Sequence, residues 1–149
     1  MHWNNLKHIP AVLTVMTPFP FTVNADDTAA VASQMMVEHA IRHLPVIERG
    51  QLIGVISDRD IRRALLGSGS PEAETLRVGD ICALEVYVID IGERLDNVLL
   101  HMSETHIGSA LVMKEDRLAG IFTMTDACHH FGELLRSRFP LSEGGDDVA

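Results

Sequence analysis

Two stretches, Gly54-Val55-Ile56-Ser57-Asp58-Arg59-Asp60 and Gly120-Ile121-Phe122-Thr123-Met124-Thr125-Asp126, share one pattern and lie 66 residues apart. Each contains a glycine, two apolar residues, a hydroxyl, two spacers and an aspartate. The apolar pair indicates the end of a strand, and a hydroxyl followed three residues later by an acid is typical of a helix start. A strand-to-helix junction that occurs twice predicts two copies of one structural unit.

The same offset aligns residues of like chemistry along most of the chain. Without gaps it pairs Val12 with Val78, Val15 with Ile81, Phe21 with Tyr87, Met36 with Met102, Ile41 with Ile107, Val46 with Val112 and Leu52 with Leu118. So many matches at one offset indicate a duplication. We therefore divide the chain into an N-terminal extension (1–11), a first repeat (12–66), a linker (67–76), a second repeat (77–135) and a tail (136–149). The Gly- and Asp-rich end of the tail predicts disorder.

Each repeat predicts the order β-α-β-β-α. Aromatic and β-branched residues predict strands at 21–23 and 87–89. A helical stripe of apolar residues follows, in the first repeat behind Asp26-Asp27 as the expected N-cap. Further strands are expected at 44–48, 52–56, 110–113 and 118–122, and closing helices after Ser57 and Thr123. We expect an α/β fold in which the two repeats pack about a pseudo-twofold axis with a cleft on that axis.

Charge and hydropathy exclude several classes of protein. The 149 residues include 21 Asp and Glu against 12 Lys and Arg, a net charge of −9. Nucleic-acid binders rely on basic surface, so no nucleic-acid partner is expected. A small anion can still bind where a few arginines and helix N-termini gather. No run reaches the ~18 apolar residues of a membrane span, and the start lacks a signal-peptide pattern, so we expect a cytoplasmic protein.

The repeated motif has two interpretations. Ser57 with Asp60, and Thr123 with Asp126, could be capping boxes that only stabilise a helix start. Alternatively, the hydroxyl and the free N–H groups of a helix N-terminus bind phosphate, and the acid accepts the hydroxyls of a ribose. Both copies keep the glycine and the apolar pair, which a cap does not require, and this favours a ligand. The interpretations are compatible, since the hydroxyl can cap its helix when no ligand is bound.

Three features together make the sequence similar to a tandem pair of CBS domains, named after cystathionine beta-synthase. They are Met16-Thr17-Pro18, Arg42-His43-Leu44-Pro45-Val46, and the two Gly-x-x-Ser/Thr-x-x-Asp ends, and the resemblance covers roughly 12–135. The family also serves IMP dehydrogenases, chloride channels and the gamma subunit of AMP-activated protein kinase. The resemblance implies a regulatory, non-catalytic module that binds AMP, ADP, ATP, S-adenosylmethionine or a related ligand between its repeats, with no obligatory cofactor. It also implies a disc-like homodimer.

The resemblance assigns roles to individual residues. Asp60 and Asp126 would hold ribose, Ser57 and Thr123 would contact phosphate, and the segment 17–22 would line the adenine pocket. The candidate ligand-binding residues are Thr17, Thr22, Arg42, His43, Ser57, Arg59, Asp60, Thr123, Thr125 and Asp126. The second repeat departs from the pattern at Cys82-Ala83-Leu84 and Ser109-Ala110-Leu111. We therefore expect unequal sites, with the Asp126 site, facing Arg42 and His43, as the main nucleotide site.

Catalytic and metal sites are not expected. Ser57, His43 and Asp60 could be assembled into a hydrolase triad, but Gly54-Val55-Ile56-Ser57 is not a nucleophile elbow. Cys128-His129-His130 are consecutive on an expected helix and therefore point in different directions, unlike the ligands of a zinc site.

Two functional classes remain open. One is a ligand sensor that controls a separate enzyme or transporter by conformational change. The other is a structural dimerisation module whose clefts are vestigial. Apolar helix residues expected to be uncovered, namely Ile61, Leu65, Phe131 and Leu134, predict a homodimer in either class.

Overall fold

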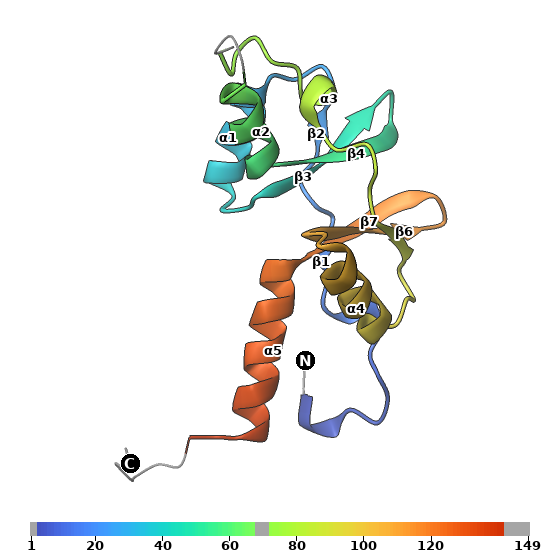
Figure 1. The fold of residues 1–149 in the computed structure, drawn as a ribbon. Coiled ribbons are helices and arrows are strands. Elements are labelled where there is room, and N and C mark those ends of the chain that lie inside the picture. The colour runs from blue at the N-terminus through green and yellow to red at the C-terminus, as the bar shows by residue number, and fades with distance from the viewer. Residues whose placement is uncertain (1–2, 68–71, 142–149) are drawn as a thin grey trace.

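A computed structural model describes residues 3–67 and 72–141 of the chain (Figure 1). Its elements, in chain order, are η1 (Trp3–Asn5), η2 (Val12–Thr14), β1 (Thr17–Pro18), β2 (Val23–Asn24), α1 (Ala29–Glu38), β3 (His43–Glu48), β4 (Gln51–Ser57), α2 (Asp58–Leu65), α3 (Val78–Ile81), β5 (Val88–Asp90), α4 (Leu95–Thr105), β6 (Ser109–Lys114), β7 (Arg117–Thr123) and α5 (Met124–Arg138). None of the helices in these ranges combines the length and the apolar composition of a membrane span.

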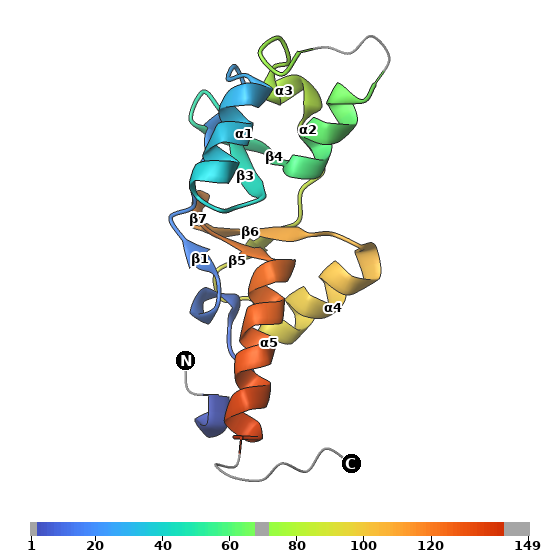
Figure 2. The same ribbon diagram turned by 90° about the vertical axis from the view of Figure 1, so that its left-hand side faces the viewer.

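The strands form two sheets that lie one above the other (Figures 1 and 2). One sheet has the order β2-β3-β4 and the other has the order β1-β7-β6-β5. In each, a parallel pair (β2 with β3, β5 with β6) is followed by an antiparallel hairpin (β3 with β4, β6 with β7). The predicted α/β fold of two β-α-β-β-α repeats is thereby confirmed.

The two hairpins repeat each other in detail. Each turns through two residues of positive φ, Arg49 (50°) and Gly50 (78°) in one and Glu115 (47°) and Asp116 (62°) in the other. Two such residues are what a tight two-residue turn of type I′ requires. Both ladders also shift register at the equivalent point, after Val46 and after Val112. The duplication therefore extends to strand register.

The opening residues of each sequence repeat pack in the other half of the molecule. We call the half built on β2-β3-β4 the first unit and the half built on β1-β7-β6-β5 the second unit. Val12 and Val15 belong to the core of the second unit, although they open the first repeat. Val78, which opens the second repeat, is fully buried in the core of the first unit. The predicted repeats, 12–66 and 77–135, are therefore duplicated sequences but not separate folding units.

These exchanged segments explain the glycine of the repeated motif. β1 pairs with β7 so that Pro18 lies opposite Gly120, and Ala83 forms the equivalent bridge with Val55. A Cβ at Gly54 would collide with the backbone oxygen of Ala83, and one at Gly120 would collide with the side chain of Met16. Glycine is thus required for close packing. Its presence in both copies does not argue for a ligand.

The segments that cross between the sheets also account for errors at the element boundaries. Strands were predicted at 21–23 and 87–89, but β2 and β5 begin later, because the preceding residues are still passing between the two units.

The cap of α1 was predicted at Asp26-Asp27. The structure instead places it at Thr28, whose Oγ1 accepts a hydrogen bond from the Val31 N–H at 3.3 Å.

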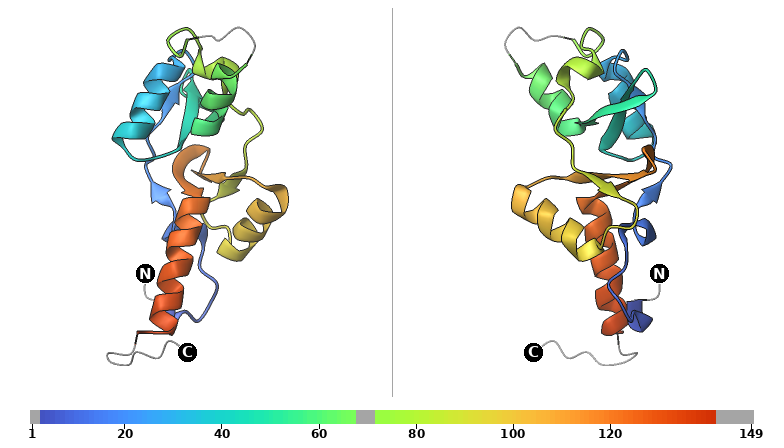
Figure 3. Two further views of the ribbon diagram at one scale, coloured as in Figure 1. Left: turned by 60° about the vertical axis from the view of Figure 1, so that its left-hand side comes forward. Right: turned by 90° about the vertical axis from the view of Figure 1, so that its right-hand side faces the viewer.

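The last helix extends beyond the second sheet and carries the N-terminal extension beside it (Figure 3). α5 continues to Arg138, three residues into the range assigned to the tail. Residues 142–149 of that tail and residues 68–71 of the predicted linker lie outside the described residues. Against α5, the Trp3 ring lies 6.0 Å from that of His130, whose Nε2 is 3.2 Å from the carbonyl oxygen of Val15. Of the apolar helix residues expected to be uncovered, Ile61 is buried, whereas Phe131 is exposed.

Candidate functional site

Both closing helices begin with the same capping box. The Ser57 Oγ accepts a hydrogen bond from the Asp60 N–H at 3.2 Å, and Asp60 Oδ2 accepts from the N–H and the hydroxyl of Ser57, both at 2.8 Å. Thr123 and Asp126 repeat this arrangement at 3.3, 2.8 and 2.8 Å. Within the described ranges, Oδ1 of each aspartate accepts no hydrogen bond. Each carboxylate therefore holds its helix with one oxygen, and its other oxygen has no hydrogen-bond partner among the described residues.

Beside the strand that leads into each capping box lies a segment that belongs to the other sequence repeat. β1 places Thr17 beside Ile121, two residues before Thr123. In the pseudo-equivalent position, Ala83 lies beside Val55, two residues before Ser57. One candidate site therefore combines Thr17 with Thr123 and Asp126. The other combines Ala83 with Ser57 and Asp60, and so offers a methyl group where the first offers a hydroxyl.

His43 lies between the two closing helices. It is paired with Ser57 in the β3–β4 ladder, and its Nε2 is 3.3 Å from the position that a Cβ of Gly108 would occupy. Gly108 in turn accepts a hydrogen bond from the N–H of Met124, the first residue of α5, at 3.1 Å. The imidazole of the first unit thus reaches the start of the closing helix of the second unit.

The charges around His43 come from both repeats. Burial lowers the pKa of His43 below its ordinary value. The Asp60 carboxylate opposes this shift and the Asp126 carboxylate does so more weakly, whereas the guanidinium groups of Arg59 and Arg42 add to it. His43 therefore responds to both capping aspartates and to two cations, with Asp60 the stronger of the two acidic neighbours.

The structure brings most, but not all, of the candidate residues together. The hydroxyl–carboxylate pairs meet as predicted, and Arg42, His43 and Arg59 gather beside them. Arg42 also accepts a hydrogen bond through its carbonyl oxygen from the N–H of Asp58, at 3.0 Å. Thr125 and Thr22 are exposed, on the first turn of α5 and on the crossing segment, and neither side chain hydrogen-bonds to another described residue.

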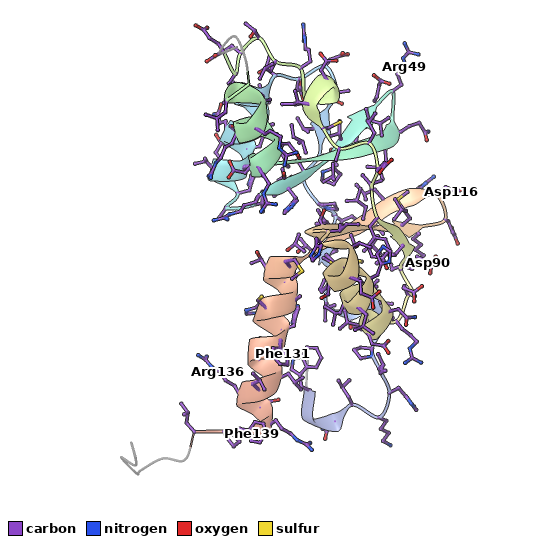
Figure 4. All side chains as sticks on the ribbon, in the orientation of Figure 1. Arg49, Asp90, Asp116, Phe131, Arg136 and Phe139 are labelled. Atoms are coloured by element: carbon purple, nitrogen blue, oxygen red, sulfur yellow. The ribbon has the colours of Figure 1, made fainter. Side chains whose placement is uncertain are left out.

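A hollow of about 660 Å³ lies between the two hairpins, at the other end of the strands. It is lined by Ile47, Gly50, Gln51, Leu52, Val88, Met113, Asp116, Arg117 and Leu118. Figure 4 labels Arg49 and Asp116 at these hairpin tips. β4 and β7 run from this hollow to Ser57 and Thr123, so none of the candidate ligand residues lines it.

A metal centre finds no support in residues 3–67 and 72–141, where no group of three or more His, Cys, Asp or Glu is placed to hold an ion. Cys128 is exposed on α5. His129 and His130 approach Glu133 at 3.4 and 3.1 Å, so these three side chains contact one another along one helix.

Sequence reasoning did not find the close contacts that the small residues of the site make. Gly108 stands where the first repeat has Arg42 and leaves the space that the His43 ring occupies. Ala83 and Cys82 lie over Gly54, as Thr17 and Met16 lie over Gly120. The 66-residue offset contained the Arg42–Gly108 difference, but nothing local could show which residue would face Gly108.

Comparison with known proteins follows the same division. The family model described as "CBS domain" matches residues 11–67 and 78–133. Hypoxic response protein 1 of Mycobacterium tuberculosis is 31% identical over 112 residues, which cover 74% of this chain and 78% of that protein. The L-aspartate semialdehyde sulfurtransferase of Methanocaldococcus jannaschii is 29% identical over 126 residues, or 83% of this chain, but the match spans only 24% of that enzyme.

Two solved structures are also similar. The CBS domain pair of protein MJ0100, in complex with 5′-methylthioadenosine and S-adenosyl-L-methionine, has a TM-score of 0.75 and 26% identity, covering 85% of this chain and 98% of that one. Hypoxic Response Protein I with two coordinated zinc ions has a TM-score of 0.69 and 30% identity, covering 80% and 98%. With its two matched segments, its two repeats and these neighbours, the chain belongs to the CBS domain family as a tandem pair.

Proposed function

We propose that this CBS pair is a regulatory module that binds an adenosine-containing ligand at its two capping boxes and controls a separate protein by a change of shape. The observation that carries the proposal is that the guanidinium groups of Arg42 and Arg59 act on His43 together with the capping carboxylates of both repeats, Asp60 and Asp126. In a chain of net charge −9, the two guanidinium groups of Arg42 and Arg59 favour an anion at this place.

The chemistry offered at each helix start fits a nucleotide. A helix N-terminus presents N–H groups and a favourable dipole to a phosphate, and arginine adds a rigid fork of donors. The free Oδ1 of each capping aspartate can accept a ribose hydroxyl, while Oδ2 keeps the helix capped. A ligand that contains both a ribose and an anionic group would use all of these donors and acceptors together.

The known ligands of a relative support the adenosine class. The MJ0100 pair was solved with 5′-methylthioadenosine and S-adenosyl-L-methionine, which share an adenosine and carry no phosphate. For this chain, the shared adenosine is the core of the proposal. AMP, ADP or ATP is its finer form, and it depends on the cations near His43.

The two sites are proposed to differ, with the Asp126 site as the main one. Thr17 and Thr123 supply two hydroxyl groups there, whereas Ala83 replaces Thr17 at the Asp60 site. His43 does not belong to one site alone, because both carboxylates act on it. The difference between the sites therefore depends on Thr17 and Arg42 more than on His43.

Calorimetric titration with AMP, ATP, S-adenosylmethionine and 5′-methylthioadenosine tests the proposal, with GMP as the control for the base. Asp126→Asn is the informative variant, because an amide oxygen can still accept the capping hydrogen bonds while its NH₂ group cannot accept a ribose hydroxyl. Losing hydrogen bonds to a charged group, about 1.5–3 kcal/mol, should weaken the tightest adenosine ligand by about 10- to 100-fold.

The matched control is Asp60→Asn, which should leave the tightest event nearly unchanged. If Asp60→Asn abolished that event and Asp126→Asn did not, the order of the sites would be reversed. If no adenosine compound bound at all, the result would favour the second candidate function, a structural module whose capping boxes and glycines serve only packing. The specific observation favouring that candidate is that the glycine and both caps already have structural roles.

A further inference from the structure

The N-terminal segment of the described chain is held on the molecule at its two ends. Residues 5–9 are exposed, and among residues 5–10 the first hydrogen bond to the rest of the described chain is that of the Pro10 carbonyl, which accepts from the Leu95 N–H at 2.9 Å. At the other end, Trp3 packs against the core of the second unit and lies beside α5 (Figure 3). We call residues 3–9 the strap. Its attachment to α5 depends on Trp3.

Trp3 meets a cluster of three titratable side chains on α5. Its ring lies 6.0 Å from that of His130, and its indole N–H approaches the Glu133 carboxylate. The nitrogen of that N–H is buried and completes no hydrogen bond within the described residues. His129 Nε2 and His130 Nδ1 also approach Glu133, at 3.4 and 3.1 Å. A buried donor that loses its nearest acceptor destabilises the arrangement that buries it, so the position of the Glu133 carboxylate decides whether Trp3 stays in place.

His130 faces an acceptor with each of its two ring nitrogens. Nε2 is 3.2 Å from the carbonyl oxygen of Val15, and Nδ1 is 3.1 Å from Oε2 of Glu133. An imidazolium ion donates from both nitrogens, whereas a neutral imidazole has one N–H and one lone pair. Both contacts of His130 can therefore be hydrogen bonds only when the ring is protonated.

Of these two contacts, the one with Glu133 is the one that a neutral His130 loses. Val15 is fixed in the core at 4% exposed, whereas the Glu133 side chain is 47% exposed and can turn toward solvent. The proton of a neutral ring therefore stays on Nε2 for Val15, and Nδ1 turns a lone pair toward the carboxylate. That carboxylate is ionised, because the hydrogen bond from His130, above all, lowers the pKa of Glu133 below its usual value. A lone pair and an ionised carboxylate repel each other.

The other charges near His130 leave its own proton as the deciding one. On α5 they are Asp126, one turn earlier, whose carboxylate already caps the helix, and His129, whose ring is 5.3 Å away. His129 is 68% exposed against 23% for His130. The strap adds Lys7 and His8, which are both exposed, and η2 with the residues that lead from it to β1 adds no ionisable group.

We propose that the strap is a proton-controlled device, held on α5 when His130 is protonated and released when His130 is neutral. In the held state His130 joins Glu133 to the Val15 carbonyl, and the carboxylate stays beside the Trp3 indole. When the proton leaves, Glu133 turns away, the indole N–H loses its nearest acceptor, and residues 3–9 detach. Because imidazoles titrate between about pH 5 and 8, the change falls in that range. Release uncovers the side of α5 that carries His130 and Glu133.

Fluorescence of Trp3 tests the proposal directly, because Trp3 is the only tryptophan of the chain. Acrylamide quenching and the emission wavelength of the ligand-free protein are measured from about pH 5 to 8. As the pH rises, quenching should increase and emission should shift to longer wavelength. The loss of one hydrogen bond should lower the ratio of held to released strap by about 3- to 10-fold.

Two matched variants show which imidazole is responsible. His130→Gln should remove the pH dependence of the quenching, whereas His129→Gln, which changes the neighbouring imidazole on the same carboxylate, should keep it. Wild-type quenching that does not depend on pH, or a dependence that survives in His130→Gln, would overturn the proposal.

Glu133→Gln tests the same mechanism in the opposite direction. The NH₂ group of glutamine can donate to the lone pair on Nδ1 of a neutral His130, and its amide oxygen can accept from the indole of Trp3. The strap should therefore stay held up to about pH 8, with the low quenching that the wild type has only at acidic pH. Release of the strap at every pH in this variant would contradict the mechanism. No ligand is present in these measurements, so a failure here leaves the adenosine proposal standing, and the reverse also holds.

Discussion

At the scale of single residues, His43 gives the site a definite dependence on pH. Burial lowers its pKa in the folded protein, with Asp60 and Asp126 opposing the shift and Arg59 and Arg42 reinforcing it. Between this lowered pKa and the ordinary value of about 6.5, the unfolded chain binds a proton that the folded chain does not. The contribution of His43 to stability is therefore complete above about 6.5 and is lost as the pH falls through that window.

A bound phosphate should reverse this shift, and that gives a prediction for binding. An anion beside His43 favours the imidazolium form and raises its pKa, so binding takes up a proton. As the pH rises from about 5.5 to 7.5, the wild type should therefore lose AMP affinity relative to His43→Gln. Calorimetry of both proteins with the same ligand checks this, because the titration of AMP itself, with a pKa near 6, is common to both and cancels. Equal pH slopes in the two proteins would place His43 away from the phosphate.

Other single residues show where sequence reasoning stopped. The pairs Ser57–Asp60 and Thr123–Asp126 could be predicted, because a capping box is local and joins two residues only three positions apart. The meaning of Gly54 and Gly120 could not, because the atoms that exclude a side chain there belong to Ala83 and Met16, which arrive from distant parts of the chain. The sequence contains the glycine in both copies of the motif, but it does not show the tertiary contact that requires it.

At the scale of elements, the close crossing of strands and exchanged segments predicts unequal effects of one substitution. Gly54→Ala should destabilise the protein more than Gly120→Ala, since the first meets the backbone of Ala83 and the second chiefly the flexible side chain of Met16. Overpacking costs about 1–3 kcal/mol, and we expect the two variants at the upper and lower ends of that range. Urea denaturation measures both losses.

Gly132→Ala is the control for that experiment. A Cβ at Gly132 meets nothing within 4 Å, and alanine is the better helix former by about 1 kcal/mol, so no loss of stability is expected. If all three substitutions changed the free energy of unfolding alike, the crossing contacts would not be the cause.

Whether an element could be predicted depends on how local the sequence pattern is that specifies it. The hairpins β3–β4 and β6–β7 were predicted within one residue at each end, because short apolar runs joined by a tight turn define them. β1 was not predicted at all. Its two residues, Thr17 and Pro18, become a strand only because β7 offers its edge. No periodicity can show a pairing that depends on a strand a hundred residues away.

At the scale of the whole molecule, the exchange of opening segments makes the two units depend on each other. Val12 is fully buried in the second unit and Val78 in the first, so each core is completed by the other sequence repeat. The sequence could predict the pseudo-twofold arrangement from the 66-residue offset. It could not predict the exchange. The offset is the same whether the opening residues of a repeat pack in their own unit or in the core of the other unit.

The exchange predicts which part of the chain can fold alone. A fragment of residues 19–84 keeps the core of the first unit complete, including Val78, Leu76 and Cys82. A fragment of residues 1–66 has the same length but loses those residues and retains Val12 and Val15, which then have no core to enter. A single core of this size supplies at most about 3–5 kcal/mol, and burying one valine about 1.5–3, so the lost residues should decide the outcome. Fragment 19–84 should give a cooperative urea transition and resist limited proteolysis, whereas fragment 1–66 should give neither. If the sequence repeat 1–66 folded as well as 19–84, the exchanged packing of η2 and α3 would be wrong.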